Sequence, residues 1–177
     1  MSIPHRRATP SSVLSGERTF FVTSSTRGKR AILQSSRSAG LFIDVLHHYR
    51  REQKYSLHEF VVMPDHFHLL VTISHGMTIE RALQFIKGGF AYRAGKELGM
   101  QAPVWQKGFS ETRIETREAY RNAREYIYSN PVKKGLAVSP SEFPYSSANP
   151  TCELDPPPQR LKPHLQTKPY GIAKAMP

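Results

Sequence analysis

Two histidines stand one residue apart in an otherwise apolar stretch, VVMPDHFHLLVTI, at residues 61–73. Successive side chains of a β-strand point to opposite faces, so His66 and His68 would project together from one face. Two imidazoles arranged in this way can bind a metal ion, with each ligating nitrogen about 2 Å from the ion. Histidine pairs of this kind are more often surface or hydrogen-bonded residues, so the stretch alone leaves both interpretations open.

A tyrosine and an asparagine form a second polar pair, in the stretch EYIYSNPV at residues 125–132. A spacing of four residues places Tyr126 and Asn130 on the same face of a helix. The amide oxygen of an asparagine can bind a hard cation. The alternative is that Tyr126 packs against the protein and that Asn130 only caps the end of the helix.

The hydrophobic pattern predicts the elements that must position these four residues. Residues rich in β-branched and aromatic types predict strands, whereas apolar residues three and four positions apart predict helices. Strands are predicted at residues 18–25, 55–63, 66–74 and 107–116, and helices at residues 38–53, 78–99 and 117–130. The order of the first six elements, βαββαβ, is that of the ferredoxin-like fold. We therefore predict an α+β protein with an antiparallel sheet, helices on one face, and the last helix as an addition.

Single residues refine these boundaries. The Pro64–Asp65 pair predicts a turn between the two central strands, and Gly99 predicts the end of the second helix. Thr116 is the predicted cap of the last helix, which we expect to end at Pro131. The Gly88–Gly89 pair predicts an irregular helix or the close approach of another backbone.

The composition favours a nucleic-acid partner inside the cell. The chain has 177 residues, with 25 Lys and Arg against 14 Asp and Glu, giving a formal charge of +11. Clustered basic side chains release counterions from nucleic acid on binding, which favours such partners. The sequence contains no run of about 18 apolar residues, so we expect no contact with a membrane. The single cysteine, Cys152, excludes an intrachain disulfide. We expect a cytoplasmic, nucleoid-associated protein.

The two ends of the chain differ in composition from the middle. Residues 1–17 are polar and rich in Ser, Pro and Arg, and we predict a disordered tail there. Residues 149–177 are rich in proline and lack apolar periodicity, which predicts an extended tail or docking arm. The predicted catalytic domain is residues 18–148.

Three strings carry a resemblance to a known family: MPDHFHLLV, VWQKGF and YIYSNPVKKGLA, in this order and at this spacing. The chain resembles the single-tyrosine HUH transposases, and among them the REP-associated tyrosine transposases, from about Thr19 to Ala148. The resemblance implies that Tyr126 is the nucleophile and that His66, His68 and Asn130 bind Mg²⁺ or Mn²⁺. It also implies cleavage and rejoining of single-stranded DNA through a 5′-phosphotyrosine link, with a hairpin as the substrate.

The resemblance leaves three points open. Some relatives are dimers that place the tyrosine helix against the partner's histidines and others are monomers, so we expect a monomer or a homodimer. Many members have an Asp-His or Asp-Arg segment where this chain has SETRIET, so Glu111 and Arg113 receive no role. The alternative functions are a hairpin-DNA-binding protein with vestigial catalysis and a metallohydrolase that activates water.

Basic and aromatic side chains supply the expected contacts to DNA. Trp105, Phe109 and Tyr92 could stack on bases, although a role in the core is equally expected of them. Lys29, Arg50 and Arg51 are further candidates for phosphate contacts. The predicted DNA-binding residues are Arg27, Arg30, Lys87, Arg93, Lys107, Lys133 and Lys134.

Overall fold

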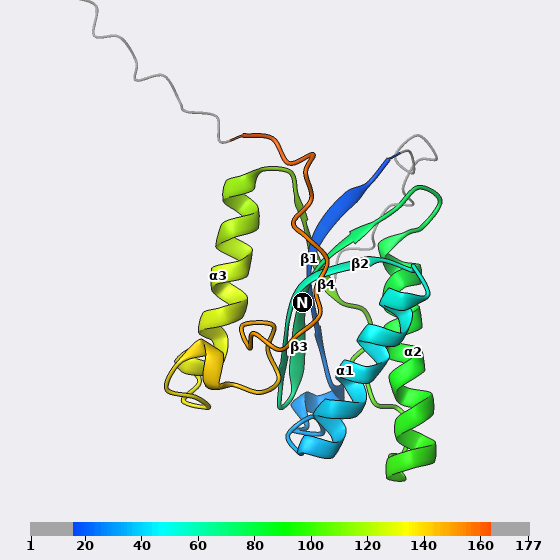
Figure 1. Cartoon of the computed structure of the whole chain (residues 1–177). Coiled ribbons are helices and arrows are strands. Elements are labelled where there is room, and N and C mark those ends of the chain that lie inside the picture. The colour runs from blue at the N-terminus through cyan, green and yellow to red at the C-terminus, as the bar shows by residue number, and fades with distance from the viewer. Residues whose placement is uncertain (1–15, 164–177) are drawn as a thin grey trace, which may run out of the picture.

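Strands with alternating side chains build a four-stranded antiparallel sheet in the computed structural model, which describes residues 16–163. The strand order is β2-β3-β1-β4, with the long hairpin of β2 and β3 at one side of the sheet (Figure 1). Together with the helices between the strands, this order is the ferredoxin-like arrangement, and it confirms the predicted α+β fold. The strands are β1 (Arg18–Ser25), β2 (Ser56–Met63), β3 (His66–Ile73) and β4 (Ser110–Ile114).

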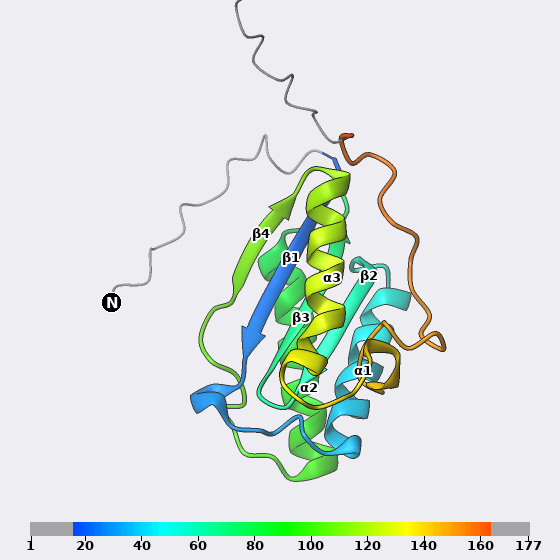
Figure 2. The same ribbon diagram turned by 90° about the vertical axis from the view of Figure 1, so that its left-hand side faces the viewer.

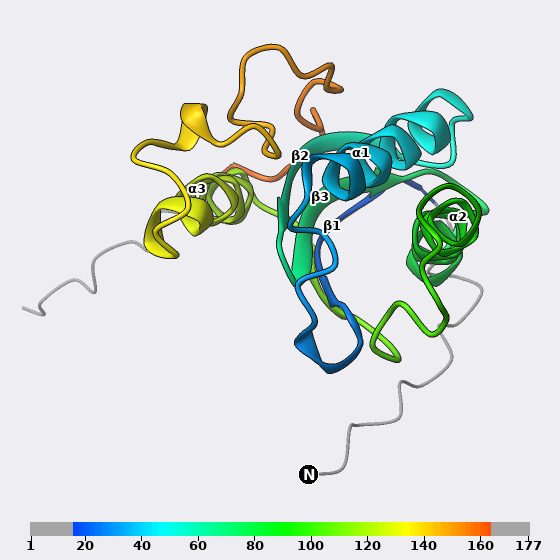
Figure 3. The ribbon, with the colours of Figure 1, turned by 90° about the horizontal axis from the view of Figure 1, so that it is seen from below.

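The helices cover both faces of the sheet. Helices α1 (Ser36–Arg51) and α2 (Ile79–Leu98) lie side by side on one face, and α3 (Arg117–Lys133) lies on the other (Figures 1 and 3). Figure 2 looks onto the face that carries α3. The side chain of Thr116 accepts a hydrogen bond from the backbone N–H of Ala119, as predicted for the cap of this helix. None of these helices is long and apolar enough to cross a lipid bilayer.

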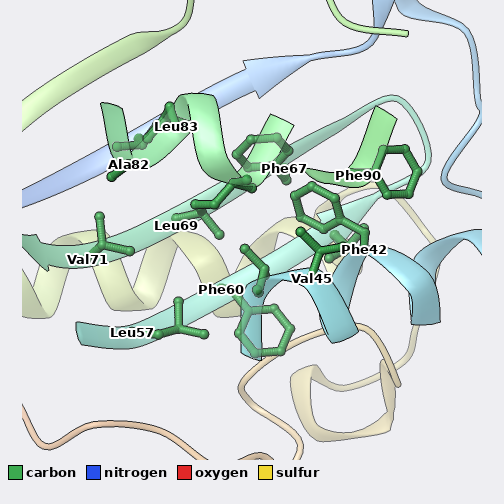
Figure 4. Close-up of a cluster of buried hydrophobic side chains, with 14 of the residues drawn as sticks. Phe42, Val45, Leu57, Phe60, Phe67, Leu69, Val71, Ala82, Leu83 and Phe90 are labelled. Carbon is green, nitrogen blue, oxygen red and sulfur yellow. The ribbon is translucent and has the colours of Figure 1, made fainter. Parts of the chain in front are cut away.

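Two hydrophobic cores lie between the sheet and the helices, one on each face. The larger one lies between the sheet and α1 and α2, where Phe42, Phe60, Phe67 and Phe90 are fully buried (Figure 4). Burying one such side chain contributes about 1.5–3 kcal/mol. The smaller core lies under α3 and consists of Val61, Met63, Leu70, Ile114, Tyr120, Ile127, Phe143 and Leu161. The alternation along β3 supplies both cores, because Phe67 and Leu69 face α1 and α2 whereas Leu70 faces α3.

The segment after α3 returns to the sheet and covers the outer edge of β2. The backbone N–H of Val62 donates to the carbonyl of Tyr145 at 2.8 Å, and that of Asp155 donates to the carbonyl of Leu57 at 2.8 Å. The Asp155 carboxylate also forms an ion pair with Arg50 at 2.9 Å. Covering an edge strand in this way removes a site for pairing with another chain. The proposed boundary at residue 148 stays a prediction. Of the two predicted tails, residues 1–15 and 164–177 lie outside the described residues.

Two local predictions were wrong in detail. Helix α3 continues through Pro131 to Lys133, and the missing N–H of Pro131 leaves one helical hydrogen bond unmade. At the glycine pair of α2, the close neighbour is a side chain and not a backbone. A Cβ atom on Gly89 would lie 2.6 Å from Cε2 of Tyr49, whereas a Cβ on Gly88 would meet nothing within 4 Å.

The two glycines of α2 should therefore respond oppositely to alanine. Gly88→Ala should raise the free energy of unfolding by about 0.5–1 kcal/mol, because alanine restricts the unfolded chain and favours the helix. Gly89→Ala gains the same propensity but displaces the Tyr49 ring, and should lower the free energy of unfolding by about 1 kcal/mol or more. Urea unfolding of the two variants checks this, and equal effects of the two substitutions would contradict the packing at Gly89.

Candidate active site

Strand β3 presents both histidines to the face that carries α3. His66 and His68 point to that face because Phe67, between them, is buried in the core on the other side. Their ring centroids are 4.9 Å apart. In the pairing of β1 with β3, Ser25 lies opposite His66 and Thr23 lies opposite His68. The neighbouring strand thus places two small polar side chains beside the two imidazoles.

Hydrogen bonds hold one nitrogen of each imidazole. Asp65 Oδ1 lies 2.6 Å from His66 Nδ1, and Thr23 Oγ1 lies 2.7 Å from His68 Nδ1. A carboxylate can only accept, so His66 donates its Nδ1–H to Asp65, and Nε2 carries the free lone pair. When His68 donates its Nδ1–H to Thr23, the Nε2 atom of His68 likewise carries a free lone pair. Partners of this kind orient the histidines of metal sites.

Burial keeps His68 neutral. Its side chain is only 3% exposed. Desolvation, reinforced by the neighbouring His66 and by the positive charge of Lys29, lowers the pKa of His68 to about 3. Burial opposes ionisation of Asp65, but the hydrogen bond from His66 and the positive charge of Lys29 hold the pKa of Asp65 below its ordinary value. At neutral pH the site therefore combines a neutral His68 with an ionised Asp65, and the neutral imidazole is the form that binds metals.

Helix α3 brings the tyrosine and the asparagine to these histidines. The ring of Tyr126 is 46% exposed and stands edge-on to His68, with the two centroids 5.1 Å apart. Asn130, only 7% exposed, places Nδ2 3.2 Å from His68 Nε2. Phe21 of β1 stacks on His68 at 5.5 Å and stands edge-on to Tyr126 at 5.7 Å, so the three rings contact one another. One chain thus gathers all four residues that the sequence singles out.

A buried carboxylate anchors the helix next to the tyrosine. Glu59 of β2 accepts hydrogen bonds from the Tyr128 hydroxyl at 2.9 Å and from the Ser147 hydroxyl at 2.8 Å. Burial raises the pKa of Glu59, and burial together with the Glu59 charge raises the pKa of Tyr128 to about 12. Ile127, between the two tyrosines, is fully buried in the smaller core. These contacts fix the rotation of α3, so that the half-exposed Tyr126 lies against His68.

The donor atoms fit a divalent cation. Asn130 Oδ1 is buried and has no hydrogen-bond partner among residues 16–163. Leaving a buried acceptor unsatisfied costs about 1–3 kcal/mol, which a bound cation would offset. Over the same residues no three His, Cys, Asp or Glu side chains come together in a way that could hold a metal. A site here would therefore use two imidazoles and an amide oxygen. The oxygen and nitrogen of an amide can exchange places by rotation, which would turn Oδ1 toward His68 Nε2.

The predicted DNA-binding residues lie in three parts of the molecule. Arg27, Arg30 and Lys107 are exposed around the end of β1, and Lys133 and Lys134 are exposed at the end of α3, with Lys133 Nζ 5.9 Å from the Tyr126 ring centroid. Lys87 and Arg93 lie instead on α2, across the sheet from Tyr126. The Lys87 ammonium donates to the carbonyls of Gln106 and Gly108, and Arg93 forms an ion pair with Glu97. The roles of all seven residues remain predictions.

The structure adds residues that the sequence motifs did not reveal. Thr23, Phe21 and Glu59 contact the site through strand register, which single-sequence periodicity does not specify. The register also places two residues left without a role: Glu111 pairs with Val22 and Arg113 pairs with Phe20. Paired residues share a face, and Val22 and Phe20 belong to the larger core. Glu111 and Arg113 thus point away from the histidines.

The low pKa of His68 predicts a loss of stability in acid. Because the folded-state pKa of about 3 lies below the ordinary value of 6.5, the unfolded chain binds the proton first as the pH falls. The contribution is complete above pH 6.5 and is lost between there and about pH 3, by at most ~1.4 kcal/mol per pH unit. Melting temperatures of the wild type and His68→Gln across this range, with a chelator present, should show a shallower decline for the variant. Parallel curves would contradict a buried neutral His68.

Comparison with known proteins gives consistent matches. The REP-associated tyrosine transposase of Escherichia coli (strain K12) is 28% identical over 130 residues, which are 73% of this chain and 75% of that protein. A solved structure of a REP-associated tyrosine transposase bound to a REP hairpin is similar with a TM-score of 0.67 and 27% identity, covering 82% of both chains. The family model described as "Transposase IS200 like" matches residues 20–130. Because this match spans more than half of the chain, the protein belongs to the IS200-like transposase family.

Proposed function

We propose that this transposase cuts and rejoins single-stranded, hairpin-forming DNA through a covalent link to Tyr126. The observation that carries the proposal is the position of the half-exposed Tyr126 ring 5.1 Å from His68, with Asn130 on the same helical face. A tyrosine that serves only as packing has no need of the buried, neutral His68 beside it. The Escherichia coli relative and the hairpin-bound neighbour support a REP-like hairpin as the substrate.

The proposed reaction is a transfer of the phosphoryl group from one oxygen to another. The Tyr126 hydroxyl oxygen forms a bond with the phosphorus while the bond between phosphorus and the 3′ oxygen breaks. The phenol proton passes to water, and the leaving 3′ oxygen takes a proton from water. The 5′-phosphotyrosine link has the same bond types as the original diester. The free 3′ hydroxyl can therefore reverse the step and rejoin strands with no external energy source.

The phenol needs assistance, because a group with a pKa near 10 is a weak nucleophile at neutral pH. His66 and His68, through Nε2, and Asn130, through Oδ1, would hold Mg²⁺ or Mn²⁺. When bound, the ion neutralises charge on the non-bridging phosphate oxygens. Two imidazoles make this donor set softer than an all-oxygen site, so Mn²⁺ should bind at least as well as Mg²⁺. Phe21 and Thr23 hold the His68 ring in place, and Tyr126 is exposed on the side from which a strand can approach.

Replacing the nucleophile should abolish the covalent product. Wild-type protein incubated with Mn²⁺ and labelled hairpin oligonucleotides from imperfect palindromes beside its gene should form an adduct on a denaturing gel. Tyr126→Phe should form none, yet should bind the same DNA. Tyr92→Phe is the matched control, because Tyr92 is 63% exposed and lies on α2, away from the histidines. Cleavage without an adduct, persisting in Tyr126→Phe, would indicate activated water instead. Binding of every hairpin with no cleavage would indicate vestigial catalysis.

Removing the hydroxyl that orients His68 should weaken metal binding. Thr23→Val keeps the shape of the side chain but loses its bond to His68 Nδ1, and we expect Mn²⁺ affinity to fall about 10–100-fold. Thr112→Val, at an exposed threonine of β4, should bind Mn²⁺ as the wild type does. Titration calorimetry with Mn²⁺ measures both. Unchanged affinity in Thr23→Val would show that this hydroxyl does not orient the ligand.

A further inference from the structure

A strained lysine lies in the short turn that follows β1. Gly28 and Lys29 have φ of 64° and 55°, and they occupy the centre of the turn Arg27–Arg30. Two consecutive positive φ values are typical of type I′ turns, in which glycine or asparagine is preferred. A side chain with a Cβ atom is disfavoured there by close contact with its own backbone. Within residues 16–163 the other non-glycine residue with positive φ is Gln53, also at 55°.

The turn places the Lys29 ammonium beside the candidate active site. Lys29 Nζ donates to Ser25 Oγ at 2.8 Å, and Ser25 is the strand partner of His66. The charge of Lys29 also contributes to the lowered pKa of both His68 and Asp65, as expected of a cation near them. In the described part of the chain, no carboxylate lies within 4.0 Å of this ammonium. Its charge is therefore available to a ligand.

The lysine turn is hydrogen-bonded to the Pro64–Asp65 turn, which leads directly into His66. The backbone N–H of Thr26 donates to the Asp65 carbonyl at 2.9 Å, and that of Leu33 donates to the Pro64 carbonyl at 2.9 Å. The Thr26 hydroxyl closes the turn with a bond to the Arg30 carbonyl at 2.7 Å. These bonds fix the lysine turn relative to the histidines before any DNA arrives. A charge held in advance stabilises a transition state more than a mobile one does.

We propose that Lys29 is a catalytic residue that contacts a non-bridging oxygen of the scissile phosphate. This inference rests on the proposed function and gives Lys29 a role different from general attraction of DNA. The ammonium neither gives nor takes a proton in the step. It stabilises the negative charge on the phosphoryl oxygens while the bond from Tyr126 forms and the bond to the 3′ oxygen breaks. Backbone strain is commonly retained at such sites because function requires the residue.

Because position 29 has a positive φ, glycine can replace the lysine there without destabilising the fold, and this substitution separates catalysis from stability. Lys29→Gly removes the charge but suits the positive φ, so it should raise the melting temperature by about 2–4 °C. Gln53→Gly is the matched control, since it relieves the same φ at the end of α1. Lys29→Arg keeps the charge. All three are compared with the wild type for melting temperature, hairpin affinity, and the single-turnover rate of adduct formation at saturating DNA with Mn²⁺.

We expect Lys29→Gly to be the more stable protein and the slower enzyme. Its adduct rate should fall about 10–100-fold at saturating DNA, while Gln53→Gly reacts as the wild type and Lys29→Arg recovers most of the rate. A wild-type rate in Lys29→Gly, or a defect that saturating DNA removes, would overturn the catalytic role alone. Absence of an adduct with the wild type itself would overturn the proposed function and this inference together.

Discussion

The packing of helix α3 against the second face of the sheet is the constraint on which the site depends. Strand β3 can aim two histidines at that face, but without α3 neither a tyrosine nor an amide would face them. Ile127 buries the helix against Val61 and Leu70, and the Tyr128–Glu59 hydrogen bond fixes its rotation. A shift of one residue turns a helix by about 100°, which would carry Tyr126 and Asn130 away from His68. The apolar packing of α3 against the sheet therefore determines where the nucleophilic Tyr126 lies.

Several locally unfavourable features gather around this contact. His68 is buried beside a cation, Asn130 Oδ1 has no partner among the described residues, and Lys29 adopts a backbone conformation that suits glycine. The first lowers the stability of the folded chain in acid, and the other two lower it at any pH. Their concentration at one end of β1 and β3 is expected where selection for chemistry outweighs selection for stability. The same logic explains why the turn that carries Lys29 is fixed by hydrogen bonds from Thr26 and Leu33 to the carbonyls of Asp65 and Pro64.

The fold could be predicted from the sequence because the hydrophobic periodicity of its strands and helices is strong. The residue types at positions 66–73 and the capping Thr116 were enough to predict β3 and the start of α3. The spacing of Tyr126 and Asn130 likewise predicted a shared face. The register between paired strands could not be predicted from one sequence. The positions of Thr23, Phe21 and Glu59 near the site therefore emerged only from the structure. Pro131 misled for a similar reason, since packing of the buried proline lets the helix continue past a residue that ordinarily ends it.

A single chain brings together the tyrosine, the asparagine and both histidines, and mixing two inactive variants tests whether one chain is sufficient for the reaction. One variant carries His66→Ala and His68→Ala but keeps Tyr126, and the other carries Tyr126→Phe but keeps the histidines. The two are given tags of different size, mixed, and incubated with hairpin DNA and Mn²⁺. The structure predicts no adduct in the mixture, because neither chain holds both halves. A covalent adduct on the histidine-deficient chain would contradict it, and would show that the tyrosine of one chain works with the histidines of another.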